Sequence, residues 1–391
     1  MWLYLLIFFI PVFFFLSTNP GRNQHSSFLF LLLLGLSLFV GFSDMFGGYD
    51  RYIYGEIFDN LADVTTRKGD YSDSLYYYSY SSEVGYTFLN VLISFFTENR
   101  YIFILIITLI IYICLFISLR KYTENYPLAV VLFMGLWFFF TFTYLRQVLA
   151  ATIVWLSIQY VIERKFWKFL VVFLIGFSMH NSAIIFFPLY FIPLRKFSPK
   201  LIVGVMLFLL LLGLSPLPNS LFEVYESSSI VERHAEYNAS GDLRIPYILE
   251  AFFFLYLILK SYKYIPADKS HVVLLNMALI FCGILLLFVR SENGGRLSWY
   301  YMIGIIATIT SICTYKINIQ NKIPIFLIGL SLFLYIRIYT GWQVYLNLYP
   351  YKTFFTNGVR AGDYSWENYE YNHEYDNDKF CRKAFRFLPN L

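Results

Sequence analysis

Apolar runs of membrane-spanning length recur along most of the chain, and they constrain its fold more than any other feature. They lie near residues 1–17, 27–43, 101–119, 127–143, 147–162, 201–214, 246–263, 271–290, 297–315 and 323–340. Because 58% of the 391 residues are hydrophobic and only 14% are charged, the chain has too little polar surface for a soluble domain. We therefore expect an all-α polytopic membrane protein with about 10–12 transmembrane helices.

The domain organisation follows from the same pattern. Residues 1–340 are expected to form a single transmembrane helical domain, and the polar, tyrosine-rich residues 341–391 a C-terminal extension. The first run, 1–17, lacks the basic start and the small-residue cleavage site of a signal peptide, so we interpret it as a retained first span. The four cysteines form no CxxC pair, which argues against a disulfide framework or a zinc site.

The charges of the loops predict which side of the membrane each loop faces. Five clusters of Lys and Arg lie at 120–121, 164–168, 195–200, 260–269 and 316–322. Such clusters usually face the cytoplasm. The loop 44–83 carries eight acidic and three basic residues, and the loop 215–245 carries five and two. Both loops are therefore expected on the exterior side.

The segment 169–193 is apolar but is interrupted near its centre by His180, Asn181 and Ser182. Its two flanking basic clusters can both be cytoplasmic only if the segment enters the bilayer and returns. A single helix of this length would cross it, since it would measure about 37 Å. We predict a broken or re-entrant helical hairpin with His180 at its tip, the alternative being two longer, tilted helices with a tight turn. Residues 84–97 are expected to form a short exterior helix that does not cross the membrane.

Arg146 and His180 are candidate site residues because each lies in apolar sequence, where an ionisable side chain is costly without a partner or a water-filled cavity. An arginine beside Gln147 at the start of a span could bind a phosphate with two hydrogen bonds, or could merely reach the headgroups. His180 could serve as a general base or donate to a phosphate oxygen. It could equally bond a carbonyl freed at the break, a role that Asn181 could share.

Arg290 and Arg296 flank the turn sequence SENGG and are expected on the same exterior side as Arg146. They could form an anion clamp or only an ion-paired loop. The chain contains no Walker A, HExxH or GxSxG motif, so ATP-driven transport and metal-dependent hydrolysis have little support. We expect no metal, no cofactor and no nucleic-acid partner.

Several segments, in this order, resemble the EpsG family of Wzy-like membrane polysaccharide polymerases. They are YDRYIYGEIF at 49–58, EVGYTFLNVLI at 83–93, YLRQVLAATIVWLSIQYVIERKFWKF at 144–169 and FLIGFSMHNSAIIFFPLYF at 173–191. Most of the likeness lies between residues 40 and 195, and GGRLSWYY at 294–301 adds to it. The resemblance implies a GT-C-like or Wzy-like helical architecture and a part in exopolysaccharide, capsule or O-antigen assembly.

The resemblance also implies an activity: a metal-independent glycosyltransferase of the bacterial cytoplasmic (inner) membrane, whose site faces the exterior. It would move a growing glycan from polyprenyl diphosphate to the non-reducing end of a new lipid-linked repeat unit. A flippase and a chain-length regulator would be its pathway partners. The expected catalytic residues are His180, Arg146 and Asp50, and the expected substrate-binding residues are Arg296, Arg290, Gln147, Glu83, Tyr54, Tyr86 and Asn181. An O-antigen-type glycan ligase and a flippase or non-catalytic subunit of an export complex are the alternatives.

Overall fold

The computed structural model describes residues 1–17, 25–43, 49–74, 83–218, 242–291, 294–315, 322–343, 348, 351, 353, 355 and 382–387. These residues are mainly helical, which confirms the predicted all-α polytopic membrane fold. Five helical stretches among them are long and apolar enough to cross a membrane: Arg100–Tyr122, Leu145–Ile162, Lys269–Leu287, Gly294–Tyr315 and Lys322–Trp342. Most of the predicted 215–245 loop and most of the 341–391 extension lie outside the described residues.

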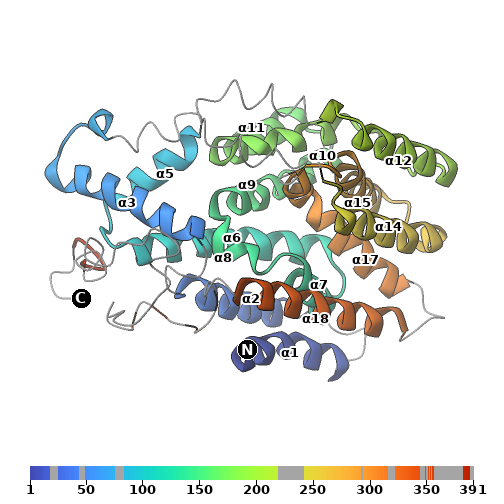
Figure 1. The fold of residues 1–391 in the computed structure, drawn as a ribbon, viewed down its shortest axis with the longest axis horizontal. Helices are drawn as coiled ribbons and strands as arrows, with labels where there is room; N and C mark the ends of the chain where they lie inside the picture. The colour runs from blue at the N-terminus through green and yellow to red at the C-terminus, as the bar shows by residue number, and fades with distance from the viewer. Residues whose placement is uncertain are drawn as a thin grey trace.

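The apolar runs correspond to helices that lie side by side in Figure 1. These helices are α1 (Trp2–Ser17), α2 (Ser26–Gly41), α6 (Arg100–Tyr122), α7 (Tyr126–Leu136), α9 (Leu145–Trp155), α12 (Pro199–Leu214), α14 (Ile245–Lys260), α15 (Lys269–Leu287), α17 (Met302–Tyr315) and α18 (Lys322–Gln343). Three runs contain breaks or additional turns. The short pieces there are α8 (Phe140–Thr143), α10 (Ile158–Ile162), α16 (Gly294–Leu297) and the 3-10 helix η6 (Ser298–Tyr301).

The region 44–83 differs from the expectation of a loop, because its centre is the 19-residue helix α3 (Tyr49–Arg67). Tyr54, Phe58, Leu61 and Ala62 are buried and lie at positions i, i+4, i+7 and i+8 of the helix, so they form one apolar face. That face packs against α6 and against α5 (Val84–Ser94). The many charged residues of α3 lower its overall hydropathy, so this helix does not stand out in the sequence as an apolar run.

Helix α5 is the short helix expected at 84–97, and its 11 residues extend only about 16 Å. It is therefore too short to cross a hydrocarbon core of about 30 Å. Tyr86 and Asn90 are buried on one face, whereas Val84 and Phe88 are exposed on the other. In Figure 1, α3 and α5 form one end of the molecule.

The segment 169–193 forms the predicted re-entrant hairpin, with α11 (Phe166–Met179) as its first arm and the 3-10 helix η3 (Asn181–Phe191) as its second. The arms measure about 21 and 22 Å, which is shorter than the hydrocarbon core. Arg164, just before the hairpin, donates to the carbonyl oxygen of Ile192 at 2.5 Å and to that of Tyr190. The chain therefore returns to the end at which it entered.

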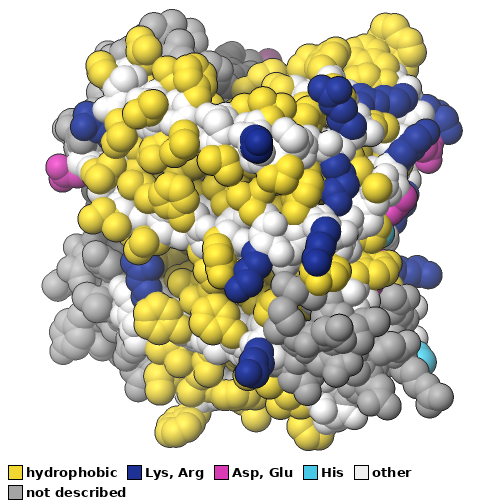
Figure 2. All heavy atoms as spheres, turned by 90° about the vertical axis from the view of Figure 1, so that its right-hand side faces the viewer, with side chains coloured by type: hydrophobic (Ala, Val, Ile, Leu, Met, Phe, Trp, Pro, Cys, Tyr) yellow, Lys and Arg dark blue, Asp and Glu magenta, His cyan; other side chains and the backbone are white. Residues whose placement is uncertain are grey.

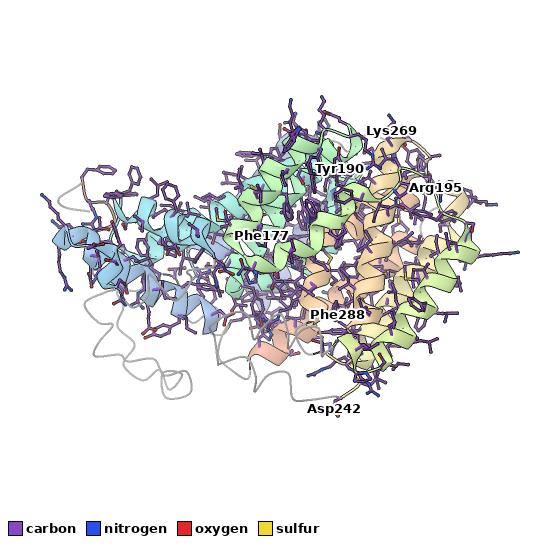
Figure 3. The ribbon with its side chains drawn as sticks, turned by 90° about the horizontal axis from the view of Figure 1, so that it is seen from above. Phe177, Tyr190, Arg195, Asp242, Lys269 and Phe288 are labelled. Atoms are coloured by element: carbon purple, nitrogen blue, oxygen red, sulfur yellow. The ribbon has the colours of Figure 1, made fainter. Side chains whose placement is uncertain are left out.

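The basic clusters at 195–200 and 260–269 are joined to each other at this same end of the molecule. Lys196 donates to the carbonyl oxygens of Tyr262 and Ile265, at 2.8 Å each. These bonds tie the loop after the hairpin to the loop before α15. In Figure 3, Arg195 and Lys269 accordingly lie at one end, and Asp242 and Phe288 lie toward the other.

His271 connects two further loops at the basic end. Its ring lies 2.5 Å from Asp268 and 3.3 Å from Glu124, which also accepts a hydrogen bond of 2.7 Å from Tyr315. Figure 2 shows Lys and Arg side chains gathered toward one side of a face that is otherwise largely apolar. Among the described residues, these contacts place the loops at 124, 164, 196 and 262–271 at one end, which agrees with the grouping inferred from the loop charges.

Candidate functional site

Glu83 is the residue at which the candidate site converges. It occupies the N-cap position of α5, but its side chain makes no capping hydrogen bond to that helix. Its carboxylate instead forms an ion pair with Arg146, in the first turn of α9. Only 7% of the Glu83 side chain and 19% of the Arg146 side chain are exposed. A pair this buried is screened far less by water than a surface pair.

The hairpin tip contacts the ion pair formed by Glu83 and Arg146. The backbone N–H of Asn181 donates to Oε1 of Glu83 at 3.4 Å, and Nδ1 of His180 lies 3.9 Å from the same oxygen. The extended backbone of His180 (φ −159°, ψ 124°) ends α11 and lets η3 begin. The predicted break in the hairpin thus places His180 and Asn181 against Glu83 and Arg146.

The contacts of His180 define which ring nitrogen carries the proton. The backbone N–H of Ser182 donates to Nδ1 at 3.2 Å, so Nδ1 is an acceptor and the neutral ring carries its hydrogen on Nε2. The Ser182 hydroxyl lies 2.7 Å from Nδ1 and 2.8 Å from the hydroxyl of Tyr300. With a quarter of its side chain exposed, His180 is arranged to donate a hydrogen bond through Nε2.

Two tyrosine rings flank the guanidinium group of Arg146. Its central carbon lies 5.3 Å from the ring centre of Tyr54 on α3 and 6.0 Å from that of Tyr86 on α5. The two rings contact each other edge to face, with centroids 6.0 Å apart. Asp50 lies one turn before Tyr54, so helical spacing places both on the same face of α3. The cluster therefore joins four elements that are distant in sequence.

Arg296 is joined to the start of α9 by two contacts. Gln147 donates to its carbonyl oxygen at 3.1 Å, and Nη2 of Arg296 donates to the hydroxyl of Tyr144 at 3.0 Å. The guanidinium group lies 4.2 Å from the Tyr144 ring centre. Arg296 is therefore held beside the first turn of α9, which carries Arg146.

Arg290 lies three residues beyond the end of α15. At this point the backbone N–H of Arg244 donates to the carbonyl oxygen of Val289 at 2.8 Å. The structure thus brings Arg296 to the start of α9, and it attaches the neighbour of Arg290 to the N-terminus of α14.

Close backbone approaches hold the hairpin against α5 and α9. A Cβ atom on Gly85 would lie 2.1 Å from Oγ of Ser178, near the hairpin tip. A Cβ atom on Gly176 would lie 2.4 Å from Cγ1 of Val154 on α9. A side chain at either position would therefore force the packed segments to shift, since real Cβ atoms do not approach other atoms so closely.

Tyr144 and Tyr300 belong to the site but were not predicted as site residues. Tyr144 lies two residues before Arg146, at the N-cap of α9, and Tyr300 lies in the GGRLSWYY segment. The segment that resembles the family was thus the available signal for Tyr300. Among the residues that the structure describes, no group of three or more His, Cys, Asp and Glu could hold a metal ion.

A family model described as the EpsG family matches residues 26–353. The chain belongs to the EpsG family. We call Glu83 and the residues around it the Glu83 cluster, which consists of Tyr54, Glu83, Tyr86, Arg146, His180 and Asn181. The match includes all of these residues and confirms the resemblance drawn from the individual segments. EpsG membership is consistent with a polysaccharide polymerase-like role and with glycosyltransferase chemistry. Neither the comparison with curated proteins nor that with solved structures gives a match.

Proposed function

We propose that this EpsG-family protein polymerises lipid-linked oligosaccharide repeat units. The growing glycan is transferred from polyprenyl diphosphate to the non-reducing end of a new repeat unit, at the outer face of the bacterial cytoplasmic membrane. The observation that carries the proposal is the meeting of Arg146, Glu83 and the His180 ring at the tip of a re-entrant hairpin.

The chemistry of this cluster suits a diphosphate leaving group. When the bond to the anomeric carbon breaks, negative charge develops on the phosphate oxygens, and fixed cations and hydrogen-bond donors stabilise it. Arg146 supplies such a cation, and Nε2 of His180 supplies a donor. Arg296 adds a second cation near the start of α9. Guanidinium groups bind phosphate oxygens without requiring a metal.

The location of the cluster supports a lipid-linked substrate. The hairpin tip lies about 21 Å along α11 from the basic end of the molecule, where Arg164 binds the hairpin base. If the basic end is cytoplasmic, the tip lies in the outer half of the bilayer. A polyprenyl chain in the outer leaflet would hold its diphosphate near this depth. Asp50, Tyr54 and Tyr86, on α3 and α5, would then contact the sugars.

Substitution of Arg146 or His180 by Ala tests the proposal in a strain from which the chromosomal gene has been deleted. We expect each variant, present in the membrane at normal level, to shorten the glycan by losing about 10²- to 10³-fold in polymerisation rate. Lys200→Ala, at the exposed basic end, is the control and should restore normal length. The measurement is the glycan length distribution. Normal length with Arg146→Ala and His180→Ala would contradict the proposal.

The alternatives predict different products from the same strain. Loss of a polymerase leaves single repeat units on the exterior face, whereas loss of a flippase leaves them on the cytoplasmic face. Loss of a ligase leaves full-length glycan attached to its lipid. Determining the length and the sidedness of the lipid-linked glycan therefore distinguishes the three functions.

A further inference from the structure

The carboxylate of Glu83 lies where the cluster would hold an external anion. It pairs with Arg146, accepts the backbone N–H of Asn181 at 3.4 Å and lies 3.9 Å from the His180 ring. A cation together with a backbone N–H at the start of a helical segment is the arrangement that proteins use to bind phosphate. Glu83 does not use its side chain to cap its own helix. Its carboxylate thus takes the place of a substrate phosphate oxygen.

Arg146 does not depend on Glu83 alone for its position. Tyr54 and Tyr86 flank its guanidinium at 5.3 and 6.0 Å, and a cation over aromatic faces is attracted by the rings. The two rings belong to different helices and contact each other. If a phosphate replaced the carboxylate, Arg146 would therefore keep its place.

The contacts of His180 limit which group can accept the proton of the attacking hydroxyl. Nδ1 of His180 is already bonded to the N–H of Ser182, so the neutral ring offers a donor at Nε2 and no further acceptor. Carboxylates are the remaining kind of base in the cluster, and the carboxylate of Glu83 forms an ion pair with Arg146. A displaced Glu83 would lie beside the phosphate that had displaced it.

We propose that Glu83 occupies the diphosphate position in the empty enzyme and becomes the general base when the substrate diphosphate takes its place on Arg146. This inference rests on the proposed function. In the step itself, the acceptor hydroxyl oxygen forms a bond to the anomeric carbon of the donor. The bond from that carbon to the diphosphate oxygen breaks, polyprenyl diphosphate leaves with the electron pair, and the hydroxyl proton passes to Glu83.

Binding of farnesyl diphosphate to the full-length protein in lipid nanodiscs tests the exchange. Because the carboxylate competes for Arg146, Glu83→Gln should bind this probe about three- to tenfold more tightly than the wild type. Glu163→Gln, an exposed carboxylate paired with Lys165 at the basic end, is the matched control and should leave binding unchanged. Weaker binding by Glu83→Gln would show that Glu83 serves only to position Arg146, and would overturn the proposal.

Polymerisation by the same variants tests the base. Glu83→Gln should lose about 10²- to 10⁴-fold in rate despite its tighter binding, and Glu83→Asp, which keeps a carboxylate, should recover at least about tenfold over Gln. A Gln variant that polymerises within about tenfold of the wild type would overturn the inference and leave the proposed function intact. A wild-type protein that shows neither binding nor polymerisation would instead refute the proposed function.

Discussion

At the scale of single residues, the ionisable side chains within apolar runs indicated the site, because burying such a side chain without a partner costs free energy. Arg146 and His180 were identified because each interrupts a hydrophobic run, and both lie in the Glu83 cluster. Glu83 was expected in the site by resemblance only, and its pairing with Arg146 was not predicted, because the two residues are 63 positions apart and nothing local links them. The sequence reveals that a buried charge needs a partner, but long-range folding decides which partner it has.

Arg51 is a buried charge that the sequence analysis did not single out. Its side chain is fully buried, and Nη2 donates to the carbonyl oxygens of Val40 and Ser43 at 2.9 Å and of Gly41 at 3.2 Å. These carbonyls lie at the C-terminus of α2, where helix geometry leaves carbonyl oxygens without helical donors. Arg51 therefore joins α3 to α2. Its role depends on α3 being a helix, which the low hydropathy of this region concealed.

Gly85 provides a prediction at this scale. In a helix, Gly→Ala ordinarily stabilises by up to about 1 kcal/mol. Here the added Cβ would lie 2.1 Å from Oγ and 2.8 Å from Cβ of Ser178, so α5 must move away from the hairpin. Overpacking of this kind costs about 1–3 kcal/mol. We expect Gly85→Ala to lower the Tm and to reduce polymerisation, both measured on the purified protein.

The control for Gly85→Ala is Gly204→Ala on α12, where an added Cβ meets nothing within 4 Å. This variant should keep or slightly raise the Tm and retain full activity, because only helix propensity changes. Equal behaviour of the two variants would show that the contact between α5 and the hairpin does not control the site.

At the scale of elements, the hairpin was predictable and α3 was not, for physical reasons that differ. The hairpin follows from a parity constraint, because the basic loops on both sides of it must face the same compartment. Helix α3 lies outside the spans and is amphipathic, so its signal is a 3.6-residue stripe, which a hydropathy profile averages away. Loop charges therefore constrain the path of the chain better than they constrain the structure within a loop.

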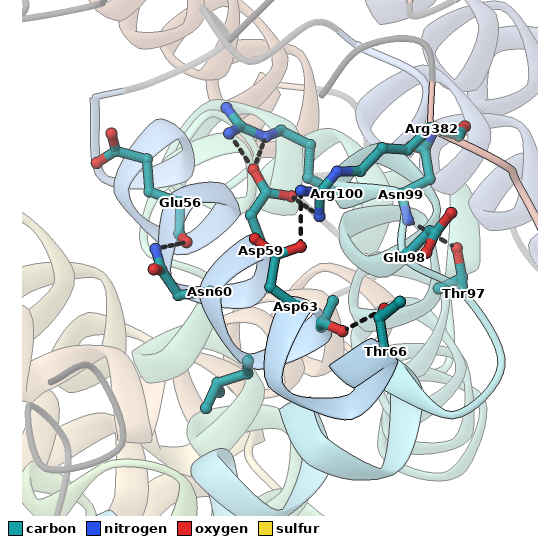
Figure 4. A network of polar contacts seen from close by, with 12 residues as sticks. Glu56, Asp59, Asn60, Asp63, Thr66, Thr97, Glu98, Asn99, Arg100 and Arg382 are labelled. Carbon is teal, nitrogen blue, oxygen red and sulfur yellow. Dashed lines mark hydrogen bonds and ion pairs between the residues drawn. The ribbon is translucent and has the colours of Figure 1, made fainter. Parts of the chain in front are cut away.

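The segment 382–387 binds the end of the molecule that carries α3 and α5. Arg382 forms an ion pair with Asp63 at 2.8 Å and lies 3.8 Å from Asp59, which is itself paired with the buried Arg100. Figure 4 shows Arg382 and Arg100 both directed toward Asp59. The segment thus extends a network of charges that begins in the protein interior.

Arg386 binds the neighbouring backbone. Its side chain donates to the carbonyl oxygens of Ser94 at 2.7 Å and of Ala62 at 3.0 Å. Its backbone N–H donates to the carbonyl oxygen of Phe96 at 2.9 Å. Ser94 ends α5, so the bonds to Ser94 and Phe96 satisfy carbonyl groups that this helix terminus leaves open. Residue 386 therefore connects α3 to α5.

Removing both arginines should loosen this end of the molecule. Since hydrogen bonds to charged groups contribute about 1.5–3 kcal/mol when buried, and these are partly exposed, we expect Arg382→Ala/Arg386→Ala to destabilise the α3–α5 layer by about 1–2 kcal/mol. Hydrogen exchange of the α5 amides should become about five- to thirtyfold faster. Lys383→Ala, at an exposed position in the same segment, should leave exchange unchanged. Exchange as slow in the double variant as in the wild type would mean that packing against the neighbouring helices holds α5 without the two arginines.

At the scale of the whole molecule, the basic loops lie at one end and the candidate site lies at the other. One end collects the loops that contain Arg164, Lys196, Asp268 and Glu124, which are joined by hydrogen bonds. The other end carries α3, α5 and the hairpin tip. Sequence rules could group the basic loops, because the rule acts on each loop independently. They could not show that the loops bond to one another, which requires the folded arrangement.

This arrangement predicts the sidedness of three exposed positions. In a background without the four native cysteines, Lys165→Cys and Arg195→Cys should resist a membrane-impermeant maleimide applied to intact cells, and Asp242→Cys should react. All three should react after the membrane is permeabilised, which serves as the control. Lys165 and Arg195 flank the hairpin, so a segment 169–193 that crossed the bilayer once would place them on opposite sides. Labelling of only one of these two in intact cells would therefore refute the re-entrant hairpin, and with it the placement of His180 beside Arg146 on the exterior side.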